Sequence, residues 1–352
     1  MLHPGDYCTA LLCLTAAKSF MLQRIENLVL GNDYMNEDKN ESPAIEFRNV
    51  SVGFDDVQVL VDISFRLEKG EMIFLTGVSG SGKSVLLRLA IGLLKPDSGQ
   101  IFIDGKEIQV LDEEELFAIR GDLMGIVFQE DSLFTGLTVY ENVAYRPRED
   151  GWAEDQIEKA VAEVLEFVGM TGEEEKLPEE LSGGMKRRLE IARALVGWPA
   201  IMLFDEPTMS LDPIVAVQVL DLIIRSRDLN KSSSLYVTKK LHELPYLANY
   251  CALQVDVQHP GQNRSNSDGP PIKKEKAGKI VIAEAPPDHL PRTKVILLEE
   301  GRIAFEGTVA EFQESDAPAI KQLLSLDHHD HSQDPYFADP WDKRRSPKEQ
   351  IL

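Results

Sequence analysis

Residues 77–84 read GVSGSGKS, a stretch in which glycines and small residues lead into a lysine and a serine. This spacing matches G-x-x-x-x-G-K-[ST], the pattern of a phosphate-binding loop, at every fixed position. Gly77, Gly80 and Gly82 allow the backbone to turn with its N–H groups pointing inward, which forms a nest for phosphate oxygens. The stretch therefore predicts that oriented backbone donors bind a phosphate group.

Lys83 and Ser84 complete this loop. Lys83 would supply a positive charge to the outer phosphates, and the hydroxyl of Ser84 could ligate Mg²⁺. A strand-like apolar run (71–76) precedes the loop and a helical run follows it, so the phosphate would also meet the positive end of a helix. This context favours nucleotide binding over the alternative, a flexible Gly/Ser linker. The residues expected to bind the nucleotide are Gly77, Ser79, Gly80, Ser81, Gly82, Lys83, Ser84 and Val85.

A pair of acidic residues follows another apolar run, in IMLFDEPT (201–208). If the run is a buried strand, Asp205 and Glu206 lie at the carboxyl end of a parallel sheet, where ligands bind in such sheets. Asp205 would hold Mg²⁺ through water, and Glu206 would orient or deprotonate an attacking water. By itself this pair could be a solvated acidic turn, but the strand and the phosphate loop upstream favour a metal and catalytic site.

The elements that would position these groups alternate between strands and helices. AIEFRNVSVGF and VLVDISFRLEKGE have the period of two expected for half-buried strands, whereas EMIFLT and AIMLF (200–204) are typical of strands buried on both faces. AEDQIEKAVAEVLEFVGM places its apolar residues on one helical face, and another helix begins near Asp212. This alternation predicts an α/β fold with a parallel sheet, to which early antiparallel strands and a helical block over 113–190 are attached.

Changes in composition divide the chain. We expect the folded domain to span 44–315, preceded by an extension, 1–43, that lacks the basic flank of a signal peptide; a later methionine is an alternative start. The segment 256–292 is rich in Pro, Gly, Ser and Lys, and we interpret it as an inserted loop. Residues 316–352 are predicted to be a C-terminal tail, which beyond roughly Leu326 is polar and expected to be partly disordered.

The charge balance excludes several classes of partner. At a net charge of -22 the chain has no global positive field to attract nucleic acid or an anionic membrane, so an anion must be held by local donors. No uninterrupted apolar run reaches the length of about 18 residues that suggests a membrane span. Three cysteines in 352 residues do not make a disulfide framework, which indicates a reducing compartment.

A third motif, LSGGMKRRLEIARAL (181–195), places Ser182 as an N-cap before two glycines and a helix, again with exposed N–H groups. Alone it could be a capped amphipathic helix. Together with the phosphate loop and the acidic pair it resembles the signature of the ATP-binding-cassette family, and the resemblance covers roughly residues 44–315. It implies a P-loop NTPase with a RecA-like α/β core, an antiparallel β subdomain and a helical subdomain.

The resemblance assigns further residues to a site for ATP and Mg²⁺. Phe54 matches the aromatic residue that stacks on adenine, and Gln129, in IVFQED, matches a loop glutamine that senses Mg²⁺ and contacts the membrane subunit. Asp212, in SLDP, matches the acidic member of the loop after the acidic pair. The metal ligands are then Ser84, Gln129 and Asp205, and the catalytic candidates are Glu206, Gln129 and Lys239.

The resemblance also implies how such a chain works. Two copies form a head-to-tail homodimer in which Ser182, Gly183 and Gly184 of one copy close over the ATP held by the phosphate loop of the other. Closing and opening of the dimer drives an integral membrane permease, as a ligand-coupled population shift would. The protein would then be cytoplasmic and peripheral, held on the inner face of the membrane by the permease, with no nucleic-acid partner.

One stretch departs from the family pattern. LYVTKK (235–240) matches a strand that in the family usually ends in threonine-histidine-aspartate, but here Thr238 is followed by Lys239 and Lys240. An ammonium group can neutralise phosphate charge, but it cannot accept a hydrogen bond from water as a neutral imidazole can. We therefore expect ATP binding and dimer closure to survive, while Lys239 slows or retunes hydrolysis. His242 is either a substitute for the missing histidine or, as we favour, a surface residue.

Within the family, several stretches resemble the phospholipid-trafficking, Mla-type (maintenance of lipid asymmetry) branch. They are SLFTGLTVYENVAY (132–145), LPEELSGGMKRR (177–188), DEPTMSLDPI (205–214) and GTVAEFQESDAPAIKQLL (307–324). This resemblance implies phospholipid transport, with a lipid-carrier subunit as a further partner. The alternatives are a cassette for another substrate, a soluble cassette ATPase without a permease, and a regulatory cassette that barely hydrolyses ATP.

Overall fold

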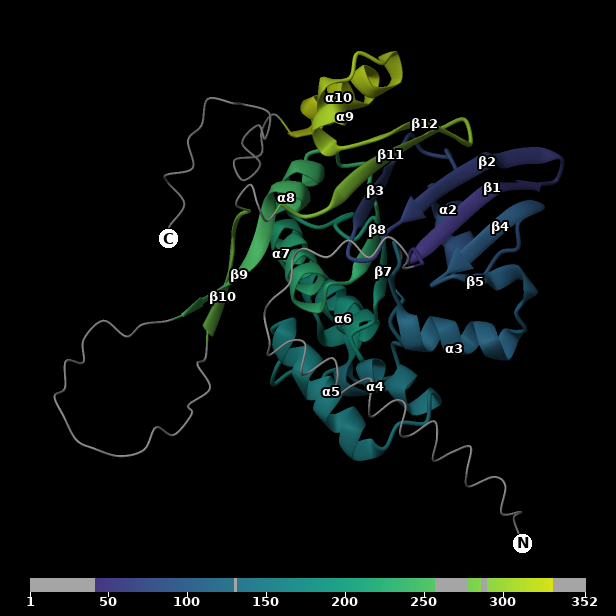
Figure 1. Cartoon of the computed structure of the whole chain (residues 1–352). Helices are drawn as coiled ribbons and strands as arrows, with labels where there is room; N and C mark the ends of the chain where they lie inside the picture. The colour runs from purple at the N-terminus through teal and green to yellow at the C-terminus, as the bar shows by residue number, and fades with distance from the viewer. Residues whose placement is uncertain (1–41, 130–131, 257–277, 286–289, 332–352) are drawn as a thin grey trace, which may run out of the picture. The chain divides into compact units, whose positions relative to one another are not determined.

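The structure, a computed structural model, describes residues 42–129, 132–256, 278–285 and 290–331 (Figure 1). The described residues belong to a unit that begins at Ser42. Nearly all of the predicted N-terminal extension, most of the predicted insertion and the end of the predicted tail lie outside the described residues.

Six strands form the central sheet, in the order β12-β11-β3-β8-β7-β6. All neighbours pair in parallel except β12, which forms an antiparallel hairpin with β11. The strands are β3 (Met72–Thr76), β6 (Met124–Val127), β7 (Ile201–Asp205), β8 (Ser233–Val237), β11 (Thr293–Glu299) and β12 (Arg302–Gly307). Because parallel strands end at the same edge of a sheet, the segments that follow β3, β7 and β8 meet there.

Alternate residues of each central strand face two different hydrophobic clusters. In β3, Met72 and Phe74 belong to one cluster and Ile73 and Leu75 belong to the other, and all four are fully buried. The sheet is thus covered on both faces. This double coverage explains why its central strands read as continuous apolar runs rather than as alternating ones.

An antiparallel sheet, in the order β2-β1-β4-β5, covers one face together with two helices (Figure 1). These elements are β1 (Ile45–Phe54), β2 (Val57–Leu67), α2 (Lys83–Ala90), β4 (Ser98–Ile103), β5 (Lys106–Glu107), a 3-10 turn (Ile108–Val110) and α3 (Glu113–Leu123). Phe47 of β1 and Phe65 of β2 are register partners, and their rings stack with centroids 4.8 Å apart. Cross-strand pairs of this kind stabilise the attached sheet.

The second cluster lies between the other face and a set of helices. The elements on this side are α4 (Val139–Glu149), α5 (Glu154–Phe167), a 3-10 turn (Pro178–Glu180), α6 (Gly183–Leu195), α7 (Pro213–Asn230), α8 (Glu243–Asn249), α9 (Val309–Glu314) and α10 (Pro318–His331). Thr138 and Thr308 begin α4 and α9 through capping boxes with Glu141 and Glu311. In the described part of the chain, every helix is too short or too polar to cross a bilayer.

The predicted α/β fold with a parallel sheet and an attached antiparallel sheet is confirmed, but three segments differ from expectation. β6 lies inside the predicted helical block, because a four-residue strand shows no period of its own and is defined by its pairing with β7. β10 (Gly278–Glu284) lies inside the predicted insertion and pairs with β9 (Tyr250–Asp256) in an antiparallel ladder. α10 lies in the predicted tail, where Ile320 reaches the core.

Candidate nucleotide and metal site

The loop between β3 and α2 has a conformation that depends on its glycines. Gly77, Gly80 and Gly82 have φ angles of 146°, 80° and 99°. A Cβ atom on Gly77 would lie 2.3 Å from the carbonyl oxygen of Leu298, and one on Gly82 would lie 2.5 Å from Cδ2 of Leu60. A Cβ atom on Gly80 would meet nothing within 4 Å. The loop is therefore packed tightly on two sides and open at Gly80, where a ligand can approach the backbone.

Lys83 begins α2 and turns its side chain back into this loop. Its ammonium donates to the carbonyl oxygens of Gly77 and Val78, both at 2.8 Å, and to Oγ of Ser81 at 3.3 Å. Burial, and then the charge of Lys239, lower the pKa of Lys83 from 10.5 to about 8, although two nearby carboxylates oppose the shift. A buried cation is thus held inside the loop that is expected to bind phosphate.

Asp205 ends β7 and lies beside the start of α2. It is 8% exposed, and within the described residues its Oδ1 has no hydrogen-bond partner. Burial raises the pKa of Asp205, while a hydrogen bond from the hydroxyl of Ser84 lowers it. A buried carboxylate oxygen without a partner, next to a hydroxyl, is a set of hard oxygen ligands that suits Mg²⁺. Ser84 and Asp205 therefore fit the ion expected from the sequence.

Glu206 follows in the left-handed backbone conformation. Its φ is 47°, which is uncommon for a residue other than glycine. Its amide donates to the carbonyl oxygen of Val237 at 2.9 Å, and its Oε1 lies 2.7 Å from Nζ of Lys239. Backbone conformations of this kind concentrate at functional sites. The strained, buried glutamate is the strongest candidate for a reacting side chain here.

The two lysines after β8 have different partners. Lys239 pairs with Glu206, whereas the ammonium of Lys240 donates to the carbonyl oxygen of Thr208 at 2.9 Å. Both partners lie in the segment after β7. The lysines therefore join the ends of two neighbouring strands, and only Lys239 contacts the acidic pair.

A buried glutamate anchors the segment that carries these lysines. Glu243, at 1% exposure, accepts hydrogen bonds from the hydroxyls of Tyr236 at 2.7 Å, Thr238 at 2.9 Å and Thr208. Glu243 is not among the residues predicted from the sequence; its one signal there is a carboxylate within the apolar run LHELPYLA. His242 is 4% exposed, so its interpretation as a surface residue is wrong, because the start of α8 packs into the core.

Replacing Tyr236 with phenylalanine is expected to lower the free energy of unfolding by about 1.5–3 kcal/mol, because it removes a buried hydrogen bond to a charged group. Urea unfolding measures the change. Tyr145→Phe, at an exposed tyrosine, is the matched control and should change stability by less than about 0.5 kcal/mol. Equal effects of the two changes would contradict the anchoring role of Glu243.

Gln129 follows β6, and an ion pair from α6 holds the backbone on both sides of it. Arg187 donates to the carbonyl oxygens of Phe128 at 2.8 Å and Gln129 at 3.4 Å, and pairs with Glu190 at 2.6 Å. Glu190 in turn accepts from the amide of Ser132 at 2.9 Å. The two residues after Gln129 lie outside the described part of the chain. The helix of the third motif thus positions the predicted magnesium-sensing segment.

The structure explains in part why serine and glycine occur at the start of α6. The side chain of Ser182 caps the helix by accepting from the amide of Met185 at 3.3 Å. A Cβ atom on Gly184 would lie 2.8 Å from Cγ1 of Val215 on α7, so close packing alone requires glycine there. Gly183 faces open space. In the described part of the chain, the hydrogen bond of Ser182 is this cap and not a contact with the phosphate loop.

Phe54 and Asp212 lie at the ends of other elements. Phe54 ends β1 with 44% of its surface exposed, before a turn in which Asp55 and Asp56 have φ angles of 47° and 65°. Its ring is therefore accessible for stacking. Asp212 is the N-cap of α7 and accepts from the amide of Val215 at 3.1 Å. This cap accounts for Asp212 without any ligand.

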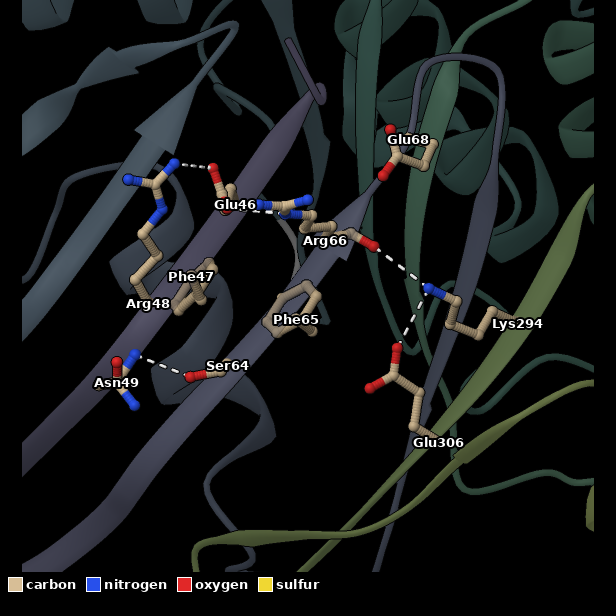
Figure 2. Close-up of a pocket in the computed structure, with 10 residues that line it drawn as sticks. All are labelled: Glu46, Phe47, Arg48, Asn49, Ser64, Phe65, Arg66, Glu68, Lys294 and Glu306. Carbon is tan, nitrogen blue, oxygen red and sulfur yellow. Dashed lines mark hydrogen bonds and ion pairs between the residues drawn. The ribbon is translucent and has the colours of Figure 1, made fainter. Parts of the chain in front are cut away.

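A hollow of about 480 Å³ lies elsewhere, between residues of β1 and β2 and residues of β11 and β12 (Figure 2). Figure 2 shows Glu46 between Arg48 and Arg66, each 2.7 Å from it, and Lys294 facing Glu306 at 3.1 Å. These charges compensate one another. None of the site residues predicted from the sequence lines the hollow, so we do not place the function there.

Comparison with known proteins agrees with this geometry. The family described as "ABC transporter" matches residues 60–209. The methionine import ATP-binding protein MetN of Carboxydothermus hydrogenoformans is 36% identical over 272 residues, which cover 72% of this chain and 79% of that protein. The protein TRIGALACTOSYLDIACYLGLYCEROL 3, chloroplastic, of Arabidopsis thaliana is 34% identical over 290 residues, covering 80% and 73%.

A solved dimeric structure of a post-hydrolysis state of an ATP-binding cassette bound to ADP and Pi matches with a TM-score of 0.58 at 24% identity, over 75% of this chain and 98% of that one. The fold is thus that of the ATP-binding cassettes, as predicted. The chain belongs to the ABC transporter family. The Mla-type branch expected from the sequence is not shown by these relatives.

Proposed function

We propose that this chain binds and hydrolyses ATP as the energy-supplying subunit of a membrane transporter. One observation carries the proposal: β8 pairs in parallel with both β3 and β7, which brings the phosphate loop with Lys83 and the acidic pair Asp205 and Glu206 to the same carboxyl edge of the central sheet. Both carboxylates also oppose the lowering of the pKa of Lys83 by burial. A phosphate loop, an acidic metal site and a buried carboxylate base are the parts that nucleotide hydrolysis requires.

Each residue has a role in this proposal. The loop amides and Lys83 bind the phosphates, and the exposed ring of Phe54 stacks on the base. Ser84 and Asp205, with Gln129, would hold Mg²⁺, which when bound neutralises charge on the terminal phosphates. Glu206 orients the attacking water and takes its proton. Glu206 is only 7% exposed, so its carboxylate is kept away from bulk water. Hydrogen bonds to the carboxylate are stronger in this buried environment than they would be in water.

A second copy of the chain would complete each site. The open N-terminus of α6 at Gly183, with Ser182 and Gly184, supplies amides and a positive helix end that can meet the terminal phosphate of ATP held by a partner. The segment at Gln129 would contact the permease, and α6 positions that same segment through Arg187. The movement of the chain when the dimer closes around ATP would then be transmitted to the permease. The permease in turn holds the protein at the cytoplasmic face of the membrane.

The function is tested on full-length protein purified with its membrane partner. Phosphate release should depend on ATP and Mg²⁺, and sedimentation should show a dimer with ATP but not with ADP. Efficient hydrolysis together with failure to recover any multi-span protein would favour the soluble cassette. Binding of ATP without turnover, even with the permease, would favour the regulatory cassette.

For the transported substrate we favour a phospholipid, on the stretches that resemble the Mla-type branch, with a lipid carrier as the further partner. The plant relative, whose name is that of a galactolipid, supports this choice. Methionine is the second candidate, because several bacterial relatives are named for its import. The identities of 36% and 34% do not separate these possibilities, since the cassette drives the permease and need not touch the substrate.

The two substrates are distinguished on the purified complex in vesicles. If lipid is the substrate, phospholipid co-purifies with the complex and raises its ATP turnover, whereas free methionine has no effect. Methionine-stimulated turnover and uptake, without bound lipid, would replace the lipid proposal with amino-acid import. Both outcomes leave the ATPase proposal standing.

Replacing Lys239 with histidine is expected to raise ATP turnover several-fold. An imidazole can accept a hydrogen bond from water, and its neutral form does not hold the Glu206 carboxylate as the ammonium does at 2.7 Å. Steady-state phosphate release from the complex measures the change, with Lys240→His as the matched control. If ATP turnover of the histidine variant is no faster than that of the natural chain, Lys239 does not limit hydrolysis.

A further inference from the structure

The hollow shown in Figure 2 contains both signs of charge and lies outside the nucleotide site. Its volume of about 480 Å³ is within the range of sites that bind small molecules. Three acidic and three basic side chains line it: Glu46, Glu68, Glu306, Arg48, Arg66 and Lys294. Because these formal charges cancel, the hollow as a whole attracts neither a net anion nor a net cation. A ligand suited to it would carry both charges itself.

Strand alternation brings charged groups of β1 and β2 to one face of the attached sheet. Glu46 and Arg66 are register partners, and Arg48 lies two residues after Glu46, so the three side chains share a face. Phe47, between Glu46 and Arg48, belongs to a hydrophobic cluster of the core. Glu68 follows the end of β2, two residues after Arg66, and lines the same hollow. Charges of both signs therefore border one space.

The basic end of the hollow has hydrogen-bond donors to spare. Nη2 of Arg48 and Nε of Arg66 each donate to the buried carboxylate of Glu46 at 2.7 Å. A guanidinium has five N–H donors, and within the described residues the remaining donors of both arginines have no hydrogen-bond partner. The two side chains are 50% and 61% exposed. Their free N–H groups suit the oxygens of a carboxylate or a phosphate.

The acidic end of the hollow has an acceptor to spare. Glu306 pairs with Lys294 at 3.1 Å, and Lys294 also lies 3.8 Å from Glu71. The amide of Glu68 donates to Glu71 at 2.9 Å, but in the part of the chain that the structure describes the carboxylate of Glu68 has neither a hydrogen bond nor an ion pair. This half-buried carboxylate can accept from the N–H groups of an ammonium.

We propose that the hollow binds a small zwitterion, with its oxyanion on Arg48 and Arg66 and its ammonium on Glu68. About 7 Å of extended backbone separates Arg66 from Glu68, and Figure 2 shows the guanidinium turned toward Glu46, away from Glu68. The charges of the ligand must therefore lie several atoms apart, as in a phosphoethanolamine group, and not on one carbon as in an α-amino acid. Such a group occurs both in soluble metabolites and at the head of a phospholipid.

The ligand class is tested by titration calorimetry on the full-length protein with glycerophosphoethanolamine. Ethanolamine and glycerol phosphate each present one half of this probe, so each should bind at least about 10-fold more weakly, because one end of the hollow stays empty. Glycerophosphocholine should also bind more weakly, because its quaternary ammonium has no N–H to donate to Glu68.

The residues are tested by substitutions at the two ends of the hollow. Glu68→Gln and Arg66→Gln are each expected to lower the affinity for glycerophosphoethanolamine about 10-fold. Glu158→Gln and Arg302→Gln, at exposed positions outside the hollow, are the matched controls and should leave it unchanged. Arg66 also holds the buried Glu46, so its variant is checked by thermal unfolding. The carboxylate of Glu68 has no such partner among the described residues, so Glu68→Gln should fold normally and is decisive by itself.

Vesicle flotation distinguishes the two sources of the ligand. Binding to phosphatidylethanolamine vesicles but not to phosphatidylcholine vesicles, together with binding of the soluble probe, would support a lipid head group. Binding of the soluble probe alone would support a free metabolite. The proposal is overturned if glycerophosphoethanolamine gives no heat of binding, if its halves bind as tightly as the whole, or if Glu68→Gln keeps full affinity. ATP binding, titrated in parallel, would remain in each of these cases, so the proposed function is judged separately.

Discussion

Replacing Lys83 with alanine is expected to weaken ATP binding at least about 100-fold, which corresponds to about 2.7 kcal/mol. The variant removes the buried ammonium whose donors are aimed into the loop at Gly77, Val78 and Ser81. Truncating one partner of a buried, hydrogen-bonded charge pair commonly has an effect of this size. Isothermal titration calorimetry with Mg²⁺ and ATP measures it.

The stability of a Lys83 variant shows whether ATP binding is lost because the protein misfolds or because the cation is missing. The pKa of Lys83 is lowered in the folded state, so between pH of about 8 and 10.5 the unfolded chain binds the proton that the folded chain has lost. Below a pH of about 8 the folded state carries the buried charge of Lys83, and this burial lowers its stability. A substitution by an uncharged residue removes that charge and the loss of stability with it. Lys83→Met keeps the apolar part of the side chain, so we expect it to be no less stable than the natural chain.

Lys159→Ala is the matched control, because it removes a lysine whose side chain is 80% exposed on α5. It should leave both ATP affinity and thermal unfolding unchanged. Tight ATP binding by a folded Lys83→Met protein would show that the phosphate loop does not bind nucleotide, and the proposed function would be lost with it.

Replacing Glu206 with glutamine is expected to lower ATP turnover by about 10²–10⁴-fold, the usual contribution of a general base. ATP binding should persist or become tighter, because the variant removes a negative charge beside the phosphates. Glutamine has the same shape as glutamate and adds no strain at a φ of 47°. Phosphate release measures turnover, and sedimentation should show the ATP-bound dimer accumulating.

Glu158→Gln, at an exposed glutamate on α5, is the matched control and should keep full turnover. If Glu206→Gln hydrolyses ATP at a rate close to that of the natural chain, another group activates the water. The buried network at Glu243 would not be a substitute, because its carboxylate already accepts from three hydroxyls.

The sequence by itself determined the parts of this protein whose physics is local. The phosphate loop could be read from the spacing of its glycines, because positive φ and close packing at Gly77 and Gly82 exclude other residues. The central strands could be read from their unbroken apolar runs, since both of their faces are buried. Ser182 was recognisable as a helix cap, and a helix was expected to begin near Asp212, because a cap contacts backbone only a few residues away.

Only the tertiary structure decided which side chains meet across elements. Three contacts depend on where β7, β8 and α8 lie relative to one another: Lys239 pairs with Glu206, Glu243 accepts hydrogen bonds from three hydroxyls, and His242 is buried. Strands β6 and β10 likewise exist through pairing with partner strands elsewhere in the chain. No period or spacing along the chain contains such contacts, because the residues that make them are neighbours in space and not in sequence.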